Sequence, residues 1–208
     1  MSYPPSQMVN RWENRPEPKP GQGQLYWHVL FKDEPRLQAL ASSAQEKLMP
    51  FAGLHLTPKQ WLHLTVMLAG FSEDFTDASI NEMTTCADQL LSSVSPITIT
   101  FSKFWYHPEA IVLGIQQSDS LNSLFEAVQN ATNTVGAHCK ARDNGLWNPH
   151  VTLAYSAAAQ SASPIIAALG HDVPSCEVTV RRVNLVVQEG PERLWNWRSL
   201  AEIPLGVS

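Results

Sequence analysis

The chain has 208 residues, of which 44% are hydrophobic and 16% are charged. The hydrophobic fraction supports a sizeable core and excludes a chain that is disordered throughout. The charged fraction lies below the average of about 25% for soluble proteins and excludes a highly charged coiled coil. The net charge of −5 argues against a protein that grips long nucleic acid mainly through its phosphates, but leaves open a pocket for one nucleotide or an RNA end.

The cysteines and the first residues of the sequence indicate a compartment. Cys86, Cys139 and Cys176 are far apart, and no Cys-x-x-Cys motif is present. This pattern is typical of a reduced cytoplasmic protein. The sequence does not start with a basic region followed by an apolar run, and it contains no run of about 18 apolar residues. We therefore expect a cytoplasmic protein that makes no membrane contact.

Residues 1–23 are rich in residues that disfavour regular structure. They include five prolines and two glycines, and few of their side chains could pack. The segment is predicted to be a disordered or loosely packed tail, laid over the body through Trp12. Residues 24–208 are predicted to form the folded body.

The first half of the body switches repeatedly between strand and helix periods. Asp33 is a suitable cap for a first helix, and Pro50 ends that helix. The elements predicted here are strands at 25–32, 61–68 and 97–104 and helices at 33–48 and 77–94.

The second half repeats this order. Its predicted elements are strands at 110–116, 147–155, 177–187 and 194–204 and helices at 121–135 and 163–169. Each half begins strand, helix, strand, helix, strand, which indicates an internal duplication and two lobes. Because the lobes interlock in sequence order, we expect one bilobal α+β domain with its helices on the outside.

A short motif occurs once in each half, at equivalent distances from the first strand of that half. The first copy is His63-Leu-Thr65-Val and the second is His150-Val-Thr152-Leu. Residues i and i+2 of a strand face the same side, so each histidine points in the same direction as its threonine. A pseudo-twofold relation between the lobes would make the two pairs face each other across a cleft.

Two imidazoles on opposite sides of one phosphorus can serve as acid and base in an in-line displacement. Two hydroxyls can hydrogen-bond the non-bridging oxygens. This chemistry needs neither a metal nor a cofactor. The sequence has no HxH, HExxH or Cys/His cluster that would indicate zinc.

At these residues the chain resembles the 2H phosphoesterase superfamily, in the branch of 2′-5′ RNA ligase-like proteins and RNA 2′,3′-cyclic phosphodiesterases. The resemblance covers about residues 11 to 204 in element order. The matching segments are Trp61-Leu-His63-Leu-Thr65, Asn148-Pro-His150-Val-Thr152-Leu-Ala-Tyr155, Tyr26-Trp-His28-Val-Leu-Phe31 and Leu194-Trp-Asn-Trp197.

The resemblance implies two antiparallel sheets flanking a central cleft, and metal-independent opening of a 2′,3′-cyclic phosphate. It implies His63 and His150 as the catalytic residues, with His63 as acid and His150 as base, and Thr65 and Thr152 as phosphate-binding residues.

One departure leaves the source of a phosphate-binding cation open. Some members of the branch follow the second motif with an arginine, where this chain has Ala154-Tyr155. The candidates in the sequence are Arg181, Arg182, Lys103, Lys140 and Arg142.

Further residues are candidates for substrate contact: His28, Tyr26, Tyr155, Trp147 and Arg182. His28 could instead be a structural histidine under the N-terminal tail. Trp105, Tyr106 and Trp147 are the aromatic residues most suited to stack on a base, because they adjoin loops near the motif strands. His55 and His107 are expected at the surface.

Three functions stay open. The leading one is hydrolysis of a cyclic or 2′-linked phosphate of a nucleotide or RNA end. The second is the reverse reaction, ligation through a 2′-5′ bond, and the third is a non-catalytic nucleotide-binding protein. The substrate could be an RNA end, a tRNA fragment, an ADP-ribose cyclic phosphate or a cyclic oligonucleotide. We expect a monomer without an obligate protein partner.

Overall fold

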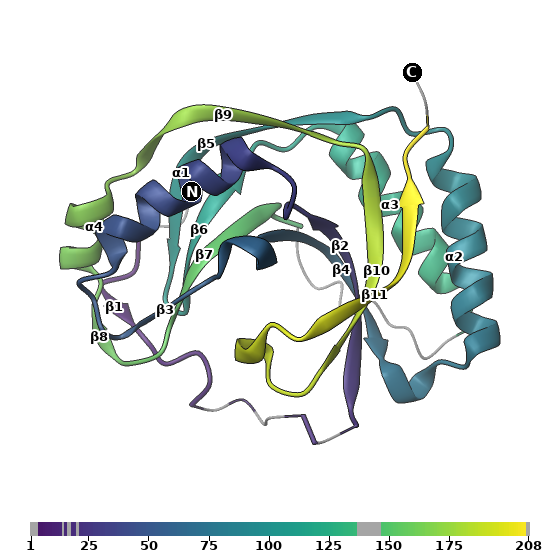
Figure 1. Cartoon of the computed structure of the whole chain (residues 1–208), viewed down its shortest axis with the longest axis horizontal. Coiled ribbons are helices and arrows are strands. Elements are labelled where there is room, and N and C mark those ends of the chain that lie inside the picture. The colour runs from purple at the N-terminus through teal and green to yellow at the C-terminus, as the bar shows by residue number, and fades with distance from the viewer. Residues whose placement is uncertain (1–3, 14, 16–17, 20, 137–146, 207–208) are drawn as a thin grey trace.

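The computed structural model describes residues 4–13, 15, 18–19, 21–136 and 147–206 (Figure 1). The helices are α1 (Pro35–Leu48), α2 (Asp77–Leu91), α3 (Asp119–Asn133) and α4 (Ser163–Leu169), with the 3-10 turns η1 (Lys59–Trp61), η2 (Ser72–Asp74) and η3 (Glu192–Leu194). The strands are β1 (Gln7–Met8), β2 (Gly23–Leu30), β3 (Leu54–Leu56), β4 (His63–Phe71), β5 (Ile97–His107), β6 (Ala110–Ile115), β7 (His150–Ser156), β8 (Gln160–Ser161), β9 (Asp172–Val180), β10 (Arg182–Glu189) and β11 (Trp197–Pro204). The predicted α+β class is confirmed.

The helices begin where the sequence offers a suitable first turn. In α2, Thr76 and Ser79 form a capping box, in which each side chain accepts a hydrogen bond from the other residue's backbone N–H. The prediction was wrong for the cap of α1, because Glu34 occupies that position and makes no side-chain cap bond. Pro35 instead favours this start, since proline has no N–H to leave unpaired in a first turn. Among the described residues, no helix combines the length and apolar character needed to cross a bilayer.

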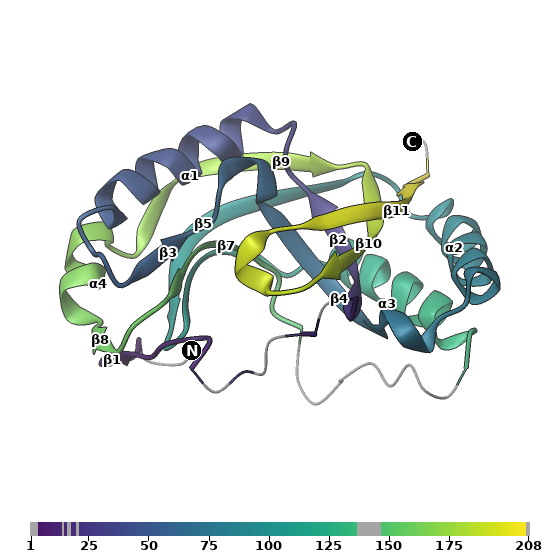
Figure 2. The same ribbon diagram turned by 60° about the horizontal axis from the view of Figure 1, so that its bottom comes forward.

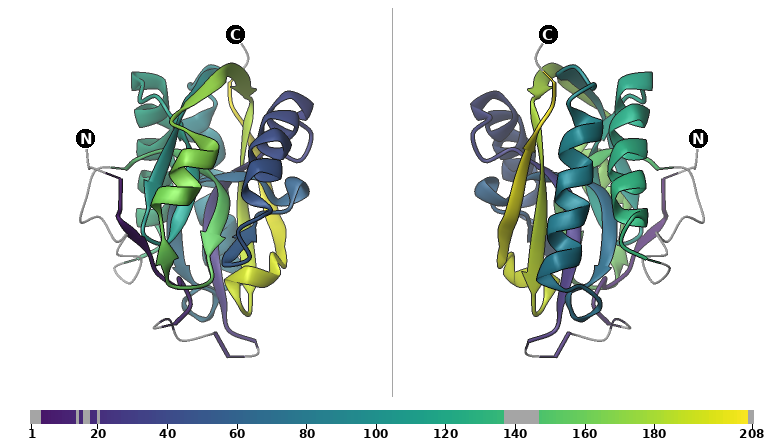
Figure 3. Two further views of the ribbon diagram at one scale, coloured as in Figure 1. Left: turned by 90° about the vertical axis from the view of Figure 1, so that its left-hand side faces the viewer. Right: turned by 90° about the vertical axis from the view of Figure 1, so that its right-hand side faces the viewer.

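Most strands join one antiparallel sheet, in the order β11-β10-β2-β4-β7-β6-β5-β9, with β3 on β7. The prediction of two separate sheets is therefore corrected. The two halves of the sheet join at β4 and β7, where Leu64 pairs with Val151. The helices α1 and α4 pack together at one end and α2 and α3 at the other, and Figure 3 views the molecule from these ends in turn. The internal duplication stays a prediction.

The sheet separates a large core from a smaller aromatic cluster. Along β2, Leu25, Trp27 and Val29 belong to the large core, which also holds the apolar stripes of the helices. The alternate residues Tyr26 and Leu30 point to the opposite face. There they pack against a second cluster, which we call the aromatic face; its buried members are Ala110, Val112, Tyr155, Val186, Trp195 and Trp197.

The strand predicted at 177–187 is in fact two strands. The first, β9, pairs with β5, whereas β10 pairs with β2 and β11. The buried residues change parity between them, from Val178 and Val180 to Val183 and Leu185. The two arginines at 181–182 interrupt the alternation, because the chain passes there from one part of the sheet to the other.

The N-terminal residues lie against the body, upstream of the predicted start of the fold at residue 24. Strand β1 pairs with β8, and the two lie side by side at the lower left of Figure 2. Met8 is fully buried, and the backbone N–H of Val9 donates to the carbonyl of Pro108 at 2.8 Å. The segment thus passes the turn between β5 and β6 on its way to the aromatic face.

Candidate active site

The two motifs lie on neighbouring strands, with His63 and Thr65 on β4 and His150 and Thr152 on β7. Because Leu64 pairs with Val151 in antiparallel register, the residues beside this pair share the opposite face of the sheet. In this register His63 lies across from Thr152, and Thr65 lies across from His150. The two histidines are therefore diagonal neighbours, for which Cβ atoms are typically about 7–8 Å apart.

The two imidazoles are held in the same way. Nδ1 of His63 is 2.8 Å from the carbonyl oxygen of Trp61, and Nδ1 of His150 is 2.7 Å from that of Asn148. In both cases the carbonyl belongs to the residue two positions upstream. A ring nitrogen bonded to a carbonyl must carry the proton, so Nε2 is the basic nitrogen of each neutral ring. The motif strands thus present two equivalent Nε2 atoms.

Burial keeps both histidines neutral. It lowers the pKa of His63 to about 4, and the charge of His150 adds to this effect, while the Trp61 carbonyl and Glu192 oppose it. Burial also lowers the pKa of His150, with help from His107 and Arg11, against the Asn148 carbonyl. The effect of His150 on His63 agrees with the diagonal placement, because the interaction between two charges weakens with distance.

His28 supports the first motif from the neighbouring strand. Its ring stacks on His63 with centroids 4.3 Å apart, and its Nε2 is 3.2 Å from the hydroxyl oxygen of Thr65. Tyr26 stacks on the other side of His28 at 5.1 Å and donates its hydroxyl hydrogen bond to Gln24. Since His28 is only 2% exposed, it lies behind Thr65 and holds the motif residues in place.

Two tryptophans cover the first motif. The ring of Trp197 packs edge-on against His63 at 4.7 Å, and Trp195 lies 6.3 Å from the same ring. Trp195 is a non-glycine residue in the left-handed region, with φ 50° and ψ 42°. This conformation costs about 1–3 kcal/mol and persists only where the surroundings enforce it. Here it turns the indole into the aromatic face, where the ring stacks on Tyr155 at 5.7 Å.

Tyr155 follows the second motif on the same strand and is 6% exposed. Burial raises its pKa to about 12, and its side chain is hydrogen-bonded to Thr152. The guanidinium of Arg11 lies over its ring, 4.3 Å from the centroid. Tyr155 thus connects a motif threonine to a cation from the N-terminal segment.

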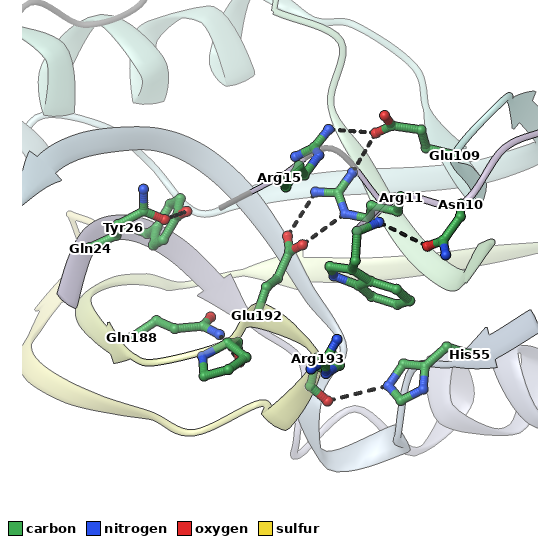
Figure 4. A network of polar contacts seen from close by, with 12 residues as sticks. Asn10, Arg11, Arg15, Gln24, Tyr26, His55, Glu109, Gln188, Glu192 and Arg193 are labelled. Atoms are coloured by element: carbon green, nitrogen blue, oxygen red, sulfur yellow. Dashed lines mark hydrogen bonds and ion pairs between the residues drawn. The ribbon is translucent and has the colours of Figure 1, made fainter. Parts of the chain in front are cut away.

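Arg11 is the centre of a network of charged groups (Figure 4). Its Nε and Nη2 atoms donate to the two carboxylate oxygens of Glu192 at 2.7 and 2.8 Å, and its Nη1 donates to Glu109 at 3.1 Å. Arg15 also donates to Glu109. Neither Arg11 nor Glu192 was predicted from the sequence, because the partners are far apart along the chain and no local pattern links them.

The other predicted contact residues lie elsewhere. Trp147 is partly buried against the large core, stacks on Phe125 at 5.2 Å, and donates its indole hydrogen bond to the backbone carbonyl of Thr65. Arg182 is ion-paired with Glu202 at 2.8 Å near the surface. Trp147 therefore braces β4 from behind, and Arg182 is already paired.

The remaining aromatic and basic candidates are distributed over both faces. Trp105 packs against the aromatic cluster, whereas Tyr106 belongs to the large core. His55, predicted at the surface, packs against Trp12 on the aromatic face. His107 has its ring 6.5 Å from His150. Lys140 and Arg142 lie outside the described residues.

In the part of the chain that the structure describes, no group of three or more His, Cys, Asp or Glu side chains could hold a metal ion. A hollow of the described surface lies between α1 and β9, and none of the motif residues lines it. The polar groups that the described residues bring to the motifs are two imidazoles, two hydroxyls and the guanidinium of Arg11.

Comparison with known proteins identifies the family. The family model of the 2′-5′ RNA ligase superfamily matches residues 32–192. The resemblance inferred from the motifs is confirmed at this level. A search of curated proteins found no match.

Solved structures share the fold at low sequence identity. The protein TT0787 of Thermus thermophilus is 18% identical with a TM-score of 0.68, covering 88% of this chain and 97% of its own. E. coli LigT complexed with 3′-AMP is 18% identical with a TM-score of 0.63, covering 91% and 99%. The ns2 PDE domain of MHV is 16% identical with a TM-score of 0.57, covering 82% and 99%.

Proposed function

The chain belongs to the 2′-5′ RNA ligase superfamily, and we propose that it is a metal-independent phosphodiesterase that hydrolyses a 2′,3′-cyclic or 2′-linked phosphate of a nucleotide or RNA end. The observation that carries this proposal is the pair of equivalent imidazoles. His63 and His150 are diagonal neighbours on adjacent strands, and each has its Nδ1 bonded to a backbone carbonyl so that Nε2 is the basic atom.

The threonines would bind the phosphate. The hydroxyls of Thr65 and Thr152 share the face of the two imidazoles and can donate to the non-bridging oxygens. His28 and Tyr155 hold these hydroxyls from behind. Such fixed donors stabilise the charge that grows on the oxygens as the phosphorus becomes five-coordinate.

The histidines would move the protons. A neutral imidazole takes the proton of the attacking water as the new P–O bond forms. The charged imidazole on the opposite side gives its proton to the ribose oxygen as that P–O bond breaks. One ring must therefore enter the reaction neutral and the other protonated, and the negative phosphate favours the protonated form of the nearby ring.

The assignment of His63 as acid and His150 as base follows the family resemblance, and the charges beside the two rings differ. Burial is the largest influence on both groups and lowers the pKa of each. The charged groups differ in sign: Glu192 raises the pKa of His63, whereas Arg11 lowers that of His150. The charge of His150 also lowers the pKa of His63, so the two roles are assigned by experiment, with a substrate whose leaving group needs no proton.

The comparisons support a nucleotide-sized ligand. E. coli LigT was crystallised with 3′-AMP, and in another structure with NADP+. Ligation through a 2′-5′ bond is the reverse reaction on the same residues. The high concentration of water favours hydrolysis for this chain.

A ³¹P spectrum tests the proposed function directly. The protein is incubated with a 2′,3′-cyclic nucleotide in EDTA, and the cyclic phosphate signal is followed as it changes to that of a phosphomonoester. We expect turnover to persist in EDTA, because two histidines and two hydroxyls supply acid, base and phosphate contacts. Activity that disappears with EDTA and returns with one divalent metal would refute the mechanism.

A further inference from the structure

The N-terminal segment is anchored at several points where it reaches the motif strands. Strand β1 pairs with β8, and Met8 is fully buried. The backbone N–H of Arg11 donates to the carbonyl of Ser156, the last residue of β7, at 2.9 Å. These contacts set the backbone of Arg11 beside the end of the second motif strand, so its side chain starts from a defined position.

From this position the guanidinium lies over the aromatic ring that supports Thr152. It is 4.3 Å from the centroid of Tyr155, and its charge contributes to the lowered pKa of His150. The side chain of Arg11 is 16% exposed. A permanent cation so close to the second motif is placed to meet the charge of a bound phosphate.

The two edges of the guanidinium have different partners. One edge, formed by Nε and Nη2, holds both carboxylate oxygens of Glu192 in a two-bond fork. The remaining nitrogen, Nη1, donates to Glu109, which Arg15 also binds. Glu109 can therefore keep the guanidinium oriented while the other edge changes its partner.

Glu192 is the partner that can be exchanged. Phosphate oxygens accept the same fork from arginine as a carboxylate does. The carboxylate of Glu192 also affects the pKa of His63, so the anion bound by Arg11 lies near the first motif as well as the second. Glu192 belongs to η3, a one-turn segment between β10 and β11, and its side chain is one-third exposed. Such a surface loop can move more readily than a sheet strand.

Unpaired donors surround the same place. Among the described residues, the buried indole N–H groups of Trp12 and Trp195 have no hydrogen-bond acceptor. Both rings pack against Tyr155, at 5.8 and 5.7 Å between centroids. A buried donor without an acceptor is costly, and an anion entering here would bring several acceptors.

We propose that Arg11 is the phosphate-binding cation of the site, supplied by the N-terminal segment, and that the substrate phosphate takes the place of Glu192 on its Nε–Nη2 edge. This proposal rests on the proposed function for the nature of the substrate. The proposed contact between Arg11 and the phosphate lies in residues 1–23, which the sequence analysis predicted to be a loose tail. It also answers the question of the cation, for which sequence candidates such as Arg182 were considered.

The test uses the full chain and inorganic phosphate as the probe, with affinity measured by calorimetric titration near pH 7. Arg11→Gln is expected to weaken phosphate binding at least 10-fold, because the fork and its charge are lost together. Arg11→Lys keeps the charge but loses the two-bond fork, so its phosphate affinity should lie between those of the wild type and Arg11→Gln. Glu192→Gln should tighten binding several-fold, since the competing carboxylate has lost its charge. Arg182→Gln, which removes an arginine paired with Glu202 outside this network, is the matched control and is expected to stay within twofold of the wild-type affinity.

Several results would overturn the proposal. One is a folded Arg11→Gln variant, checked by its thermal unfolding, that binds phosphate as tightly as the wild type. Another is tighter binding or faster turnover in Arg11→Gln, which would make the segment an inhibitory plug. A wild-type protein that shows no saturable phosphate binding would also refute it. If Arg11→Gln does not fold, two other variants test the proposal. Glu192→Gln should tighten phosphate binding and Arg11→Lys should weaken it, and the absence of either change would refute the proposal.

The proposed function fails separately. The wild type could leave every 2′,3′-cyclic phosphate intact and still bind phosphate through Arg11. This result would refute the phosphodiesterase activity but not the proposed phosphate site. Conversely, the wild type could hydrolyse cyclic phosphates while Arg11→Gln changes neither turnover nor phosphate affinity. This result would support the phosphodiesterase activity and refute the role of Arg11.

Discussion

The two motif strands carry the same tetrapeptide pattern in unequal surroundings. On β4, His63 is 9% exposed, stacked on His28 and covered by Trp197. On β7, His150 keeps more of its surface accessible and has His107 as its aromatic neighbour. Each strand also has one ionised group nearby, Glu192 for the first motif and Arg11 for the second.

The two copies of the motif are locally alike but have different surroundings. The local structure makes the two histidines equivalent, because each ring is bonded to the carbonyl two residues upstream. The tertiary surroundings then make them different, since they supply charges of opposite sign. In acid–base catalysis this difference is useful, because one group must give a proton while the other takes one.

Removal of either imidazole is expected to have the largest effect on turnover. His63→Ala and His150→Ala are each expected to slow turnover of a 2′,3′-cyclic nucleotide by about 10²- to 10⁴-fold. Substrate binding should change little, because the threonines still contact the phosphate. Steady-state kinetics separate the two effects as losses in kcat and in KM.

A substrate with a thio leaving group sharpens the same experiment. A departing thiolate hardly needs a proton, so this substrate should rescue the variant that lacks the acid, which we assign to His63. The variant that lacks the base should stay slow. Equal rescue of both variants, or of neither, would contradict the assigned roles.

The stability of the fold should report the deeper burial of His63. Its pKa of about 4 in the folded protein lies below the value of about 6.5 for an exposed histidine, so the unfolded chain binds the proton first as the pH falls. Stability is then fully retained above pH 6.5 and is lost as the pH falls to about 4, by about 3 kcal/mol from this group. Burial also holds the pKa of His28 well below its usual value, so His28 adds to the loss.

Urea unfolding between about pH 4 and 7 measures this effect. His63→Gln should show a flatter dependence of the unfolding free energy on pH than the wild type, whereas the exposed His171→Gln should leave it unchanged. His150→Gln should give a smaller change, because the ring is less buried. An identical slope in His63→Gln and wild type would argue against a neutral, buried His63.

The threonines provide the smallest expected difference. Thr65→Val and Thr152→Val remove one hydroxyl each and should lower kcat/KM by about 10-fold, the value of one hydrogen bond to a charged group. Thr65→Ser and Thr152→Ser keep the hydroxyl and should retain most of the activity. A serine variant as slow as its valine counterpart would assign the loss to packing against His28 or Tyr155.

The secondary structure and the motifs could largely be predicted from local patterns. The alternation of apolar residues located β4 and β7. A spacing of two residues predicted that each histidine shares a face with its threonine, because side-chain direction in a strand follows from backbone geometry. The break between β9 and β10 is also visible in the sequence, as the change of parity at residues 181–182, although the prediction there was a single strand. Short pairings such as β1 with β8 carry too few residues to form a local pattern.

The amino-acid sequence by itself thus determined the α+β class, the helices and the two His-x-Thr motifs, because these depend on periods of two and 3.6 residues within short segments. Only the tertiary structure decided that Leu64 and Val151 are paired, so that the motifs become neighbours. It also decided that Arg11 and Glu192 meet across 181 positions of the chain. Such contacts depend on where distant segments are held when the core closes, and neither residue carries a local pattern that indicates the other.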